Sequence, residues 1–374
     1  MGAVEVIFWV AAGLIVYTHV GYPLALALLA RLRAPDRPPA ATTLPTVSLI
    51  VAAHDEEAVI ADKVRNALAL DYPRELLEVI VASDGSDDAT VARAEAAGAD
   101  VVLDLDRAGK LSAQNAAVER STAELVAFSD ANADWSADAL RELVAPFAGE
   151  KVGYVCGQAR FRDQGGSNQE GLYWRLELAI RGLESRLGGV TAGNGAIYAV
   201  RRAAYLPLGP ASSHDLSFPF MLTKRGWRAV YAPRAVAEEK MVATVEGEFA
   251  RKRRMMRGLW DEVVGDGMLS PRGYRPLYAW QIASHRVLRY LTPLLHVVAF
   301  STNVALVGVS WIYVVTLALQ VAVLAAAALA GPVPVRPFQL ARYYVLTTAS
   351  IAAALWDRIR LGTPGAWEKA EGTR

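Results

Sequence analysis

The sequence predicts an α/β protein in which a doubly wound, mostly parallel sheet lies between membrane-spanning segments. Strand-like and helix-like stretches alternate from residue 45 to about residue 275, and long uncharged runs flank that range. Hydrophobic residues make up 53% of the 374 residues, against the roughly 45–50% that is usual for soluble chains. The excess fits a chain with a membrane portion at each end.

Composition excludes several classes of protein. Lys and Arg number 39 against 38 Asp and Glu, so the formal net charge is only +1. This balance excludes a histone-like binder of polyanions and an acidic disordered chain. A single cysteine, Cys156, excludes an internal disulfide framework and any zinc or iron–sulfur site built from several cysteines.

Residues 1–44 are expected to form a membrane helix, at about 6–30, and a linker. The apolar run carries no formal charge and is followed by Arg31 and Arg33, and about 20 such residues suffice to cross a bilayer. A secretory signal fits less well, because the preceding residues include Glu5 and no Lys or Arg.

Residues 276–374 are expected to return to the membrane. The run 290–335 is long enough for two spans, at about 290–309 and 312–332, with an interfacial helix before them. Residues 343–356 are too short to cross and are predicted to be interfacial or re-entrant. With three crossings, the basic flanks of all the spans face one side, which places the middle domain and the C-terminus in the cytoplasm. Four crossings would export the basic tail.

Residues 45–275 are predicted to form the α/β domain. Four β-branched or apolar runs predict strands, at Thr46–Ala53, Val79–Ser83, Val101–Leu105 and Leu125–Ser129. Helical stretches follow them at Glu57–Leu70, Ala89–Ala97, Lys110–Arg120 and Ala137–Phe147. This alternation is typical of a parallel sheet, whose ligands bind beyond the carboxyl ends of the strands.

Acidic residues follow three of these strands. The segments are His54-Asp55-Glu56-Glu57, Ser83-Asp84-Gly85-Ser86 and Ser129-Asp130-Ala131-Asn132. The first turn lacks the Gly-x-Gly-x-x-Gly that receives a pyrophosphate, which argues against a nicotinamide dehydrogenase. Carboxylates at these positions suit hydrogen bonds to a sugar or base, or a hard cation that neutralises phosphates.

Taken in order, these segments and four later ones resemble those of membrane-bound family 2 glycosyltransferases with a GT-A fold. That group includes cellulose, chitin, hyaluronan and poly-N-acetylglucosamine synthases. The resemblance implies that Ala53, His54 and Glu56 line the nucleotide and that Asp84 holds its base or ribose. Asp84-Gly85 alone would equally indicate a plain turn. Gly109-Lys110-Leu111-Ser112 implies that Lys110 meets the diphosphate of the donor, although a solvated lysine fits the same pattern.

Phe128-Ser129-Asp130-Ala131-Asn132 resembles the family's metal-binding Asp-x-Asp motif. The resemblance implies that Asp130 and Asn132 hold Mg²⁺ or Mn²⁺ on the diphosphate. Asn132 departs from the motif, and its amide oxygen can ligate a hard cation but adds no charge. Asp134 is either a further ligand or a helix cap.

Thr191-Ala192-Gly193-Asn194-Gly195 resembles the glycine-rich loop beside the acceptor, so Gly193, Asn194 and Gly195 are expected at the acceptor. The plain alternative is a tight turn before a strand. Ser213-His214-Asp215 resembles the segment that holds the catalytic base, which would be Asp215. His214 replaces the usual neighbour and is expected to raise or lower the pKa of that base according to its own charge.

Phe249 to Gly258 lies where the family has Gln-x-x-Arg-Trp. By resemblance Arg254 contacts the diphosphate, although a basic run is also typical of a solvated or membrane-facing surface. Met255 stands at the position of the tryptophan that forms the acceptor platform in polymer synthases.

The resemblance implies inverting, metal-dependent transfer of a sugar from a nucleotide-sugar, a UDP-sugar in most of the group, to a growing glycan. Two alternatives stay open: single transfer to a membrane lipid or lipid-linked oligosaccharide, and a non-catalytic membrane scaffold. The expected partners are the donor, a glycan or lipid-linked acceptor and membrane lipids, without nucleic acid.

Overall fold

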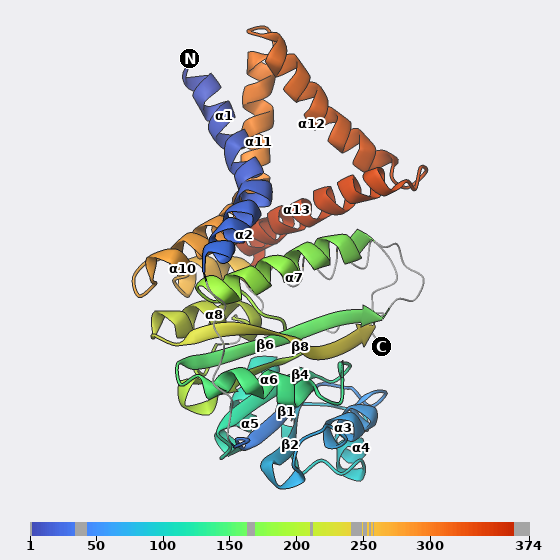
Figure 1. Cartoon of the computed structure of the whole chain (residues 1–374). Coiled ribbons are helices and arrows are strands. Elements are labelled where there is room, and N and C mark those ends of the chain that lie inside the picture. The colour runs from blue at the N-terminus through green and yellow to red at the C-terminus, as the bar shows by residue number, and fades with distance from the viewer. Residues whose placement is uncertain are drawn as a thin grey trace.

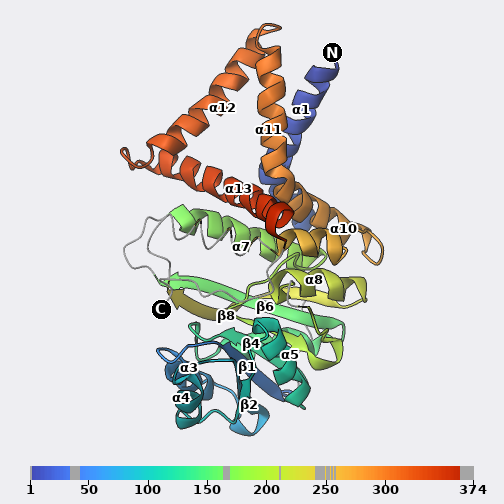
Figure 2. The same ribbon diagram turned by 180° about the vertical axis from the view of Figure 1, so that it is seen from behind.

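The computed structural model describes residues 2–33, 43–162, 169–209, 212–240, 249, 253, 256 and 258–362. A sheet with its covering helices forms one end of the molecule, and long helices project from the other end (Figure 1). Between them lie α7 (Gln169–Leu187) and α13 (Arg336–Leu361), stacked one above the other in both views (Figures 1 and 2).

The sheet has eight strands in the order β3-β2-β1-β4-β7-β6-β8-β5. Their bounds are β1 (Val47–Ala53), β2 (Leu77–Asp84), β3 (Val101–Leu105), β4 (Leu125–Asp130), β5 (Asp134–Trp135), β6 (Val152–Arg162), β7 (Tyr198–Arg201) and β8 (Arg228–Lys240). β1 pairs in parallel with β2 and β4, and β2 with β3, as the alternation of strands and helices predicts. β7 runs antiparallel to both β4 and β6, so the second half of the sheet is mixed.

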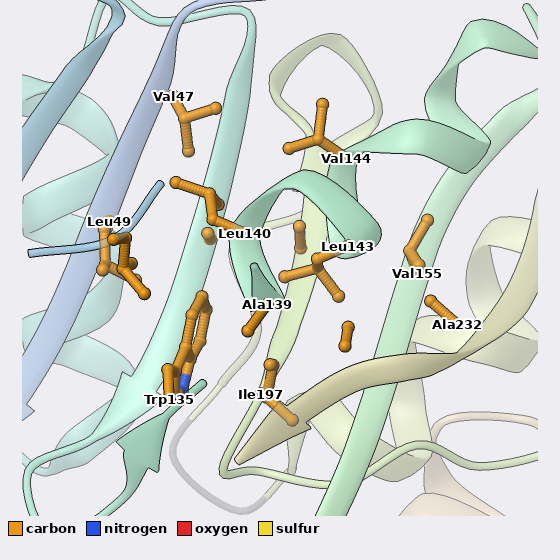
Figure 3. Close-up of a cluster of buried hydrophobic side chains, with 14 of the residues drawn as sticks. Val47, Leu49, Trp135, Ala139, Leu140, Leu143, Val144, Val155, Ile197 and Ala232 are labelled. Carbon is orange, nitrogen blue, oxygen red and sulfur yellow. The ribbon is translucent and has the colours of Figure 1, made fainter. Parts of the chain in front are cut away.

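Helices cover both faces of the sheet. They are α3 (Ile60–Leu68), α4 (Thr90–Ala96), α5 (Lys110–Arg120), α6 (Ala139–Val144) and α8 (His214–Lys224). Alternate strand residues face opposite ways, so Leu49 packs in the cluster that contains α6, whereas Ile50 packs in the cluster with α5 and α8. Figure 3 shows Leu140 and Leu143 of α6 against the sheet. Burying each such side chain contributes about 1.5–3 kcal/mol.

The strands and helices predicted between Thr46 and Phe147 lie within a few residues of the observed ones. One shift of three residues concerns α3, which was expected from Glu57 and begins at Ile60. Asp55 there has a positive φ of 48°, and the amides of Val59 and Ile60 both donate to the carbonyl of Glu56. A turn therefore separates β1 from α3, and it carries the motif residues.

Among the residues that the structure describes, two helices are long and apolar enough to cross a membrane. One joins α1 (Ala3–Val16), the π-helical turn η1 (Tyr17–Gly21) and α2 (Tyr22–Leu32), and the other is α12 (Trp311–Leu329). α11 (Leu288–Leu306), where a further span was expected, is not among them. It carries Thr292, His296 and Asn303, so the third crossing stays a prediction.

The C-terminal segment differs from the short interfacial piece expected at 343–356, because α13 has 26 residues. Its last turns are anchored to the α/β domain by two ion pairs. Arg253 contacts Asp357 at 2.6 Å, and Arg358 contacts Asp261 at 2.7 Å. These pairs are made by residues too distant in the sequence for local patterns to indicate them. Before α11, α10 (Pro276–Gln281) and the π-helical turn η6 (Ile282–Val287) continue into it without a break.

Candidate active site

The turn after β1 holds His54 and Glu56 against the end of the sheet. Both side chains are buried, with 3% and 5% of their surface exposed. The Arg107 guanidinium contacts His54 Nε2, and the backbone N–H of Glu56 donates to Thr90 Oγ1 at 2.7 Å. Ala53 ends β1 and is fully buried. The predicted nucleotide-binding residues are therefore brought together, and nucleotide contact by them stays a prediction.

Asp84 organises the loop that leads to Lys110. Its Oδ1 accepts hydrogen bonds from the backbone N–H groups of Ala108 at 2.7 Å and Gly109 at 2.9 Å. Gly109 has φ 97°, a conformation that side chains other than hydrogen disfavour. The carboxylate at the tip of β2 thus fixes the start of α5, a positioning role that the motif alone did not reveal.

Lys110 and Asp130 form an ion pair at the tips of α5 and β4. Burial lowers the pKa of Lys110, but Asp130, Asp215 and Glu239 outweigh it and hold that pKa above its ordinary value. Gly195 lies beside the pair, since a Cβ built there would be 3.6 Å from Asp130 Oδ2 and 4.0 Å from Lys110 Nζ. The lysine predicted for the diphosphate thus lies with the carboxylate predicted for the metal.

The residues at Asp130 fit a divalent cation that also binds the substrate. Asp130 already pairs with a positive charge, the ammonium group of Lys110, and Asn132 lies in the turn that follows β4. Among the described residues, no three His, Cys, Asp or Glu side chains gather as a metal site. Mg²⁺ is ordinarily held by one or two carboxylates together with substrate phosphates and water. A site made of Asp130, Asn132 and a diphosphate has that character.

Lys63 supports this turn from behind and was not among the predicted site residues. It is 3% exposed, and its Nζ donates to the carbonyl of Ala133 at 2.8 Å. Burial lowers its pKa to about 7, although Asp134 and Asp130 act in the opposite direction. The sequence did not indicate a role for Lys63, because the carbonyl that its side chain binds lies 70 residues further along the chain.

The loop predicted for the acceptor, residues 191–195 (the acceptor loop), is held by hydrogen bonds of its backbone and of the Asn194 side chain. The N–H of Gly193 donates to the carbonyl of Asp215 at 2.7 Å, and its own carbonyl accepts from Arg181 Nη2 at 2.9 Å. Asn194 is buried, and its Nδ2 donates to the carbonyl of Gly157 at 2.6 Å. Asn194 therefore braces the loop, while Gly193 links it to the predicted base.

Asp215 lies in the first turn of α8, where the helix dipole favours a carboxylate. His214 points into an aromatic cluster, with its Nδ1 at 2.7 Å from Tyr198 Oη. Burial, together with Lys110, lowers the pKa of His214 well below its ordinary value. His214 is therefore neutral at neutral pH, and it adds no positive charge beside the base.

A second carboxylate approaches Asp215 from a distant part of the chain. Glu262 is 2% exposed, and its Oε1 accepts from Ser213 Oγ at 2.6 Å. Burial raises its pKa well above the ordinary range, and the charges of Asp215 and Asp266 act in the same direction. Glu262 falls in none of the sequence motifs and lies 49 residues from Ser213, so no local pattern indicated it.

Arg254 and Met255, predicted for the diphosphate and the acceptor platform, lie outside the described residues. Three of the described site residues, Lys110, Asp130 and Asp215, lie next to one loop. Gly195 lies beside the Lys110–Asp130 pair, and the N–H of Gly193 donates to the backbone carbonyl of Asp215. A donor diphosphate bound at the Lys110–Asp130 pair and an acceptor hydroxyl bound at Asp215 would therefore both lie next to residues 193–195.

Comparisons with known proteins bear on the family and the fold of the α/β domain. Residues 45–258, more than half of the chain, match the family described as "Glycosyltransferase like family 2". A beta-monoglucosyldiacylglycerol synthase of Trichormus variabilis is 29% identical over 279 residues, which cover 67% of this chain and 57% of that protein. A poly-beta-1,6-N-acetyl-D-glucosamine synthase of Staphylococcus aureus is 25% identical over 245 residues, with coverages of 62% and 59%. The chain thus spans less than two thirds of the length of these relatives.

One solved structure resembles nearly the whole molecule. The mannosyltransferase PcManGT from Pyrobaculum calidifontis, in complex with GDP-Man and Mn²⁺, has a TM-score of 0.73. It covers 95% of this chain and 99% of its own, at 24% identity, so the likeness concerns the fold. Since the family match begins just before β1 and runs past α8 into the basic segment, the chain belongs to glycosyltransferase-like family 2, and its α/β domain has the GT-A fold.

Proposed function

We propose that this protein transfers a sugar from a nucleotide-sugar to a hydroxyl group presented at the membrane, with inversion at the anomeric carbon. The observation that carries the proposal is the loop at 193–195, where Gly195 lies beside the Lys110–Asp130 pair and the N–H of Gly193 donates to the backbone carbonyl of Asp215. A single base on the acceptor side is what direct displacement requires.

The donor end of the site offsets negative charge. A divalent cation bound at Asp130 and Asn132 would supply charge stabilisation to the departing diphosphate. Lys110 is held charged at the same place, by Asp130 and its neighbours. By resemblance, Arg254 would add a second positive charge, and the turn after β1 with Asp84 would receive the nucleoside, which we take to be uridine.

The acceptor end removes a proton. Asp215 accepts it from the attacking hydroxyl while the bond to the anomeric carbon forms and the bond to the diphosphate breaks. His214 contributes no charge, because it is buried and neutral. The backbone of Asp215 is held to the loop by the hydrogen bond that its carbonyl accepts from the N–H of Gly193 at 2.7 Å.

Two acceptors satisfy this geometry. A growing glycan is the acceptor that the sequence resemblance implies, and a poly-N-acetylglucosamine synthase is among the relatives. A membrane lipid is the other acceptor. α12 leans away from α1 and α11 in both views and is mostly exposed, as a helix in contact with bilayer lipid would be (Figures 1 and 2). A glycolipid synthase is likewise among the relatives.

The test uses the full chain purified in detergent, with native lipid extract and Mg²⁺ or Mn²⁺, and a panel of UDP- and GDP-sugars. Nucleotide diphosphate release is followed, and the product is sized and its anomer assigned by NMR. A ladder of high-mass glycan supports polymer synthesis, and one lipid-sized product supports single transfer. Asp215→Asn is expected to lower turnover roughly 10²- to 10⁴-fold, whereas Asp104→Asn, at an exposed carboxylate on β3, is the control. Full turnover by Asp215→Asn would sink the base assignment, and no release with any donor would favour a scaffold.

A further inference from the structure

Helix α7 buries a charged face that the proposed mechanism does not use. Glu177, Arg181 and Glu184 follow one another at spacings of four and three residues, so they lie on one side of the helix. Their exposed fractions are 7%, 3% and 0%. Burying an ion costs several kcal/mol unless its partners are well placed. The partners of these residues therefore show what this face of α7 holds together.

Glu184 joins three parts of the chain. Its Oε1 accepts a hydrogen bond from Tyr22 Oη of α2 at 2.5 Å and lies 2.7 Å from His285 Nδ1 in η6. Its Oε2 accepts from the backbone N–H of Thr191 at 3.2 Å and from Thr191 Oγ1 at 2.9 Å. Burial raises the pKa of Glu184, but His285 and Arg286 outweigh this and keep that pKa below its ordinary value. One carboxylate thus links the N-terminal membrane helix, the helix leading into α11 and the acceptor loop.

The link continues from Thr191 to the base. Thr191 Oγ1 also accepts from Arg286 Nε at 2.8 Å, so the residue is fixed from α7 and from η6. Two residues later, Gly193 receives Arg181 on its carbonyl and donates its N–H to the carbonyl of Asp215. The position of Asp215 along the acceptor side is therefore coupled to Glu184 through a stretch of three residues.

Glu177 provides a matched comparison on the same helix face. Within the described residues its ion pairs go to His285 at 3.3 Å, Arg286 at 3.4 Å and Arg289 at 2.5 Å. Burial raises its pKa, but Arg289 and His285 outweigh this and hold it well below the ordinary range. Glu177 is thus buried and has a lowered pKa, as Glu184 does, but within the described residues it bonds to η6 and α11 and not to the acceptor loop.

We propose that Glu184 is a positioning residue, which sets the acceptor loop and Asp215 against the membrane helices so that a membrane acceptor meets the base. The inference rests on the proposed function. It predicts that transfer to the acceptor depends on Glu184, whereas reaction of the donor with water depends on it much less. Glu184 touches no reacting atom in this account, because it acts through Thr191 and Gly193.

The experiment compares Glu184→Gln with Glu177→Gln in the full chain, reconstituted in phosphatidylcholine nanodiscs that contain native lipid extract. Nucleotide release is measured with the extract, which reports transfer, and in nanodiscs without it, which reports hydrolysis. Glu184→Gln is expected to lower kcat/KM for the acceptor roughly 10- to 100-fold, the size of a lost hydrogen bond to a charged group. In Glu184→Gln, the KM for the donor and the rate of donor hydrolysis are expected to stay within about twofold of the wild type. Glu177→Gln is expected to keep the transfer-to-hydrolysis ratio of the wild type.

A milder pair covers the case in which Glu184→Gln does not fold. Thr191→Val removes the hydroxyl at nearly constant side-chain size and is expected to lower the transfer-to-hydrolysis ratio. Thr191→Ser keeps the hydroxyl and is expected to have the ratio of the wild type. Hydrogen exchange of the peptide that covers residues 189–197 gives a readout without turnover, and faster exchange is expected in Glu184→Gln than in Glu177→Gln. Equal exchange in the two variants overturns the inference, as does an equal fall of transfer and hydrolysis in Glu184→Gln. The proposed function is judged separately, by whether the wild type releases nucleotide at all.

Discussion

Replacing Gly193 by alanine is expected to displace the acceptor loop, because the added methyl group has no room. A Cβ at this position would lie 1.9 Å from Tyr154 Oη, 2.9 Å from its Cζ and 3.1 Å from Cys156 Cβ. Ordinary contacts to a Cβ begin at 3.4 Å, so loop and phenol must separate by about 1.5 Å. Tyr154 is 0% exposed, and its ring therefore cannot swing into solvent.

The size of the effect follows from where the strain falls. Overpacking of a filled core costs about 1–3 kcal/mol. The same peptide donates the 2.7 Å hydrogen bond to Asp215 and accepts from Arg181, so the loop and the base move together. If the whole cost appears in the transfer step, kcat/KM for the acceptor falls roughly 5- to 150-fold, since each 1.36 kcal/mol is worth a factor of ten.

The assay is the initial rate of nucleotide diphosphate release against acceptor concentration, with thermal unfolding in parallel. Adding Tyr154→Phe removes the oxygen that the methyl group meets first, and is expected to recover part of the loss. Gly182→Ala on α7 is the control, because a Cβ there meets nothing within 4 Å and alanine is the better helix former. Wild-type kcat/KM together with wild-type thermal stability in Gly193→Ala would refute the reasoning.

Three further outcomes test the electrostatics. Lys63→Met is expected to stabilise the fold by up to about 5 kcal/mol at pH 7, because Lys63 has a pKa near 7 when folded. Above pH 7 the folded chain binds fewer protons than the unfolded chain, so the stability of the wild type rises toward pH 10. The stability difference between Lys63→Met and the wild type should therefore shrink over this range. A difference in thermal unfolding that stays constant with pH contradicts this. Glu262→Gln is expected to gain stability relative to the wild type as pH rises above about 4.5. The reason is that the raised pKa of Glu262 lets the folded chain keep a proton that the unfolded chain loses. A stability difference that does not change with pH in the same thermal scans contradicts this prediction. Asp130→Ala is expected to raise the Mn²⁺ concentration for half-maximal nucleotide release roughly tenfold or more, and an unchanged metal titration removes Asp130 as the main ligand.

Local sequence patterns were sufficient for the parallel half of the sheet. Val101–Leu105 and Lys110–Arg120 were predicted at their observed bounds, because a β-branched run and a helical stretch each express a local preference. The same patterns placed Asp130 and the start of α5 at one edge, since parallel strands end on the same side. The mixed half did not follow, because the pairing of β7 with both β4 and β6 depends on long connections rather than on local propensity.

The sequence by itself therefore determined which chemistry the chain carries: carboxylates after three strands, a lysine at a helix start, and Asp215 behind a glycine-rich loop. Only the tertiary structure decided which groups support them. Lys63 reaches Ala133 across 70 residues, Ser213 reaches Glu262 across 49, and Glu184 reaches His285 across 101. Such contacts depend on sheet register and on how helices pack, which no window of neighbouring residues encodes. Burial then sets the charge of each group, so neutral His214 and protonated Glu262 were beyond the reach of any motif.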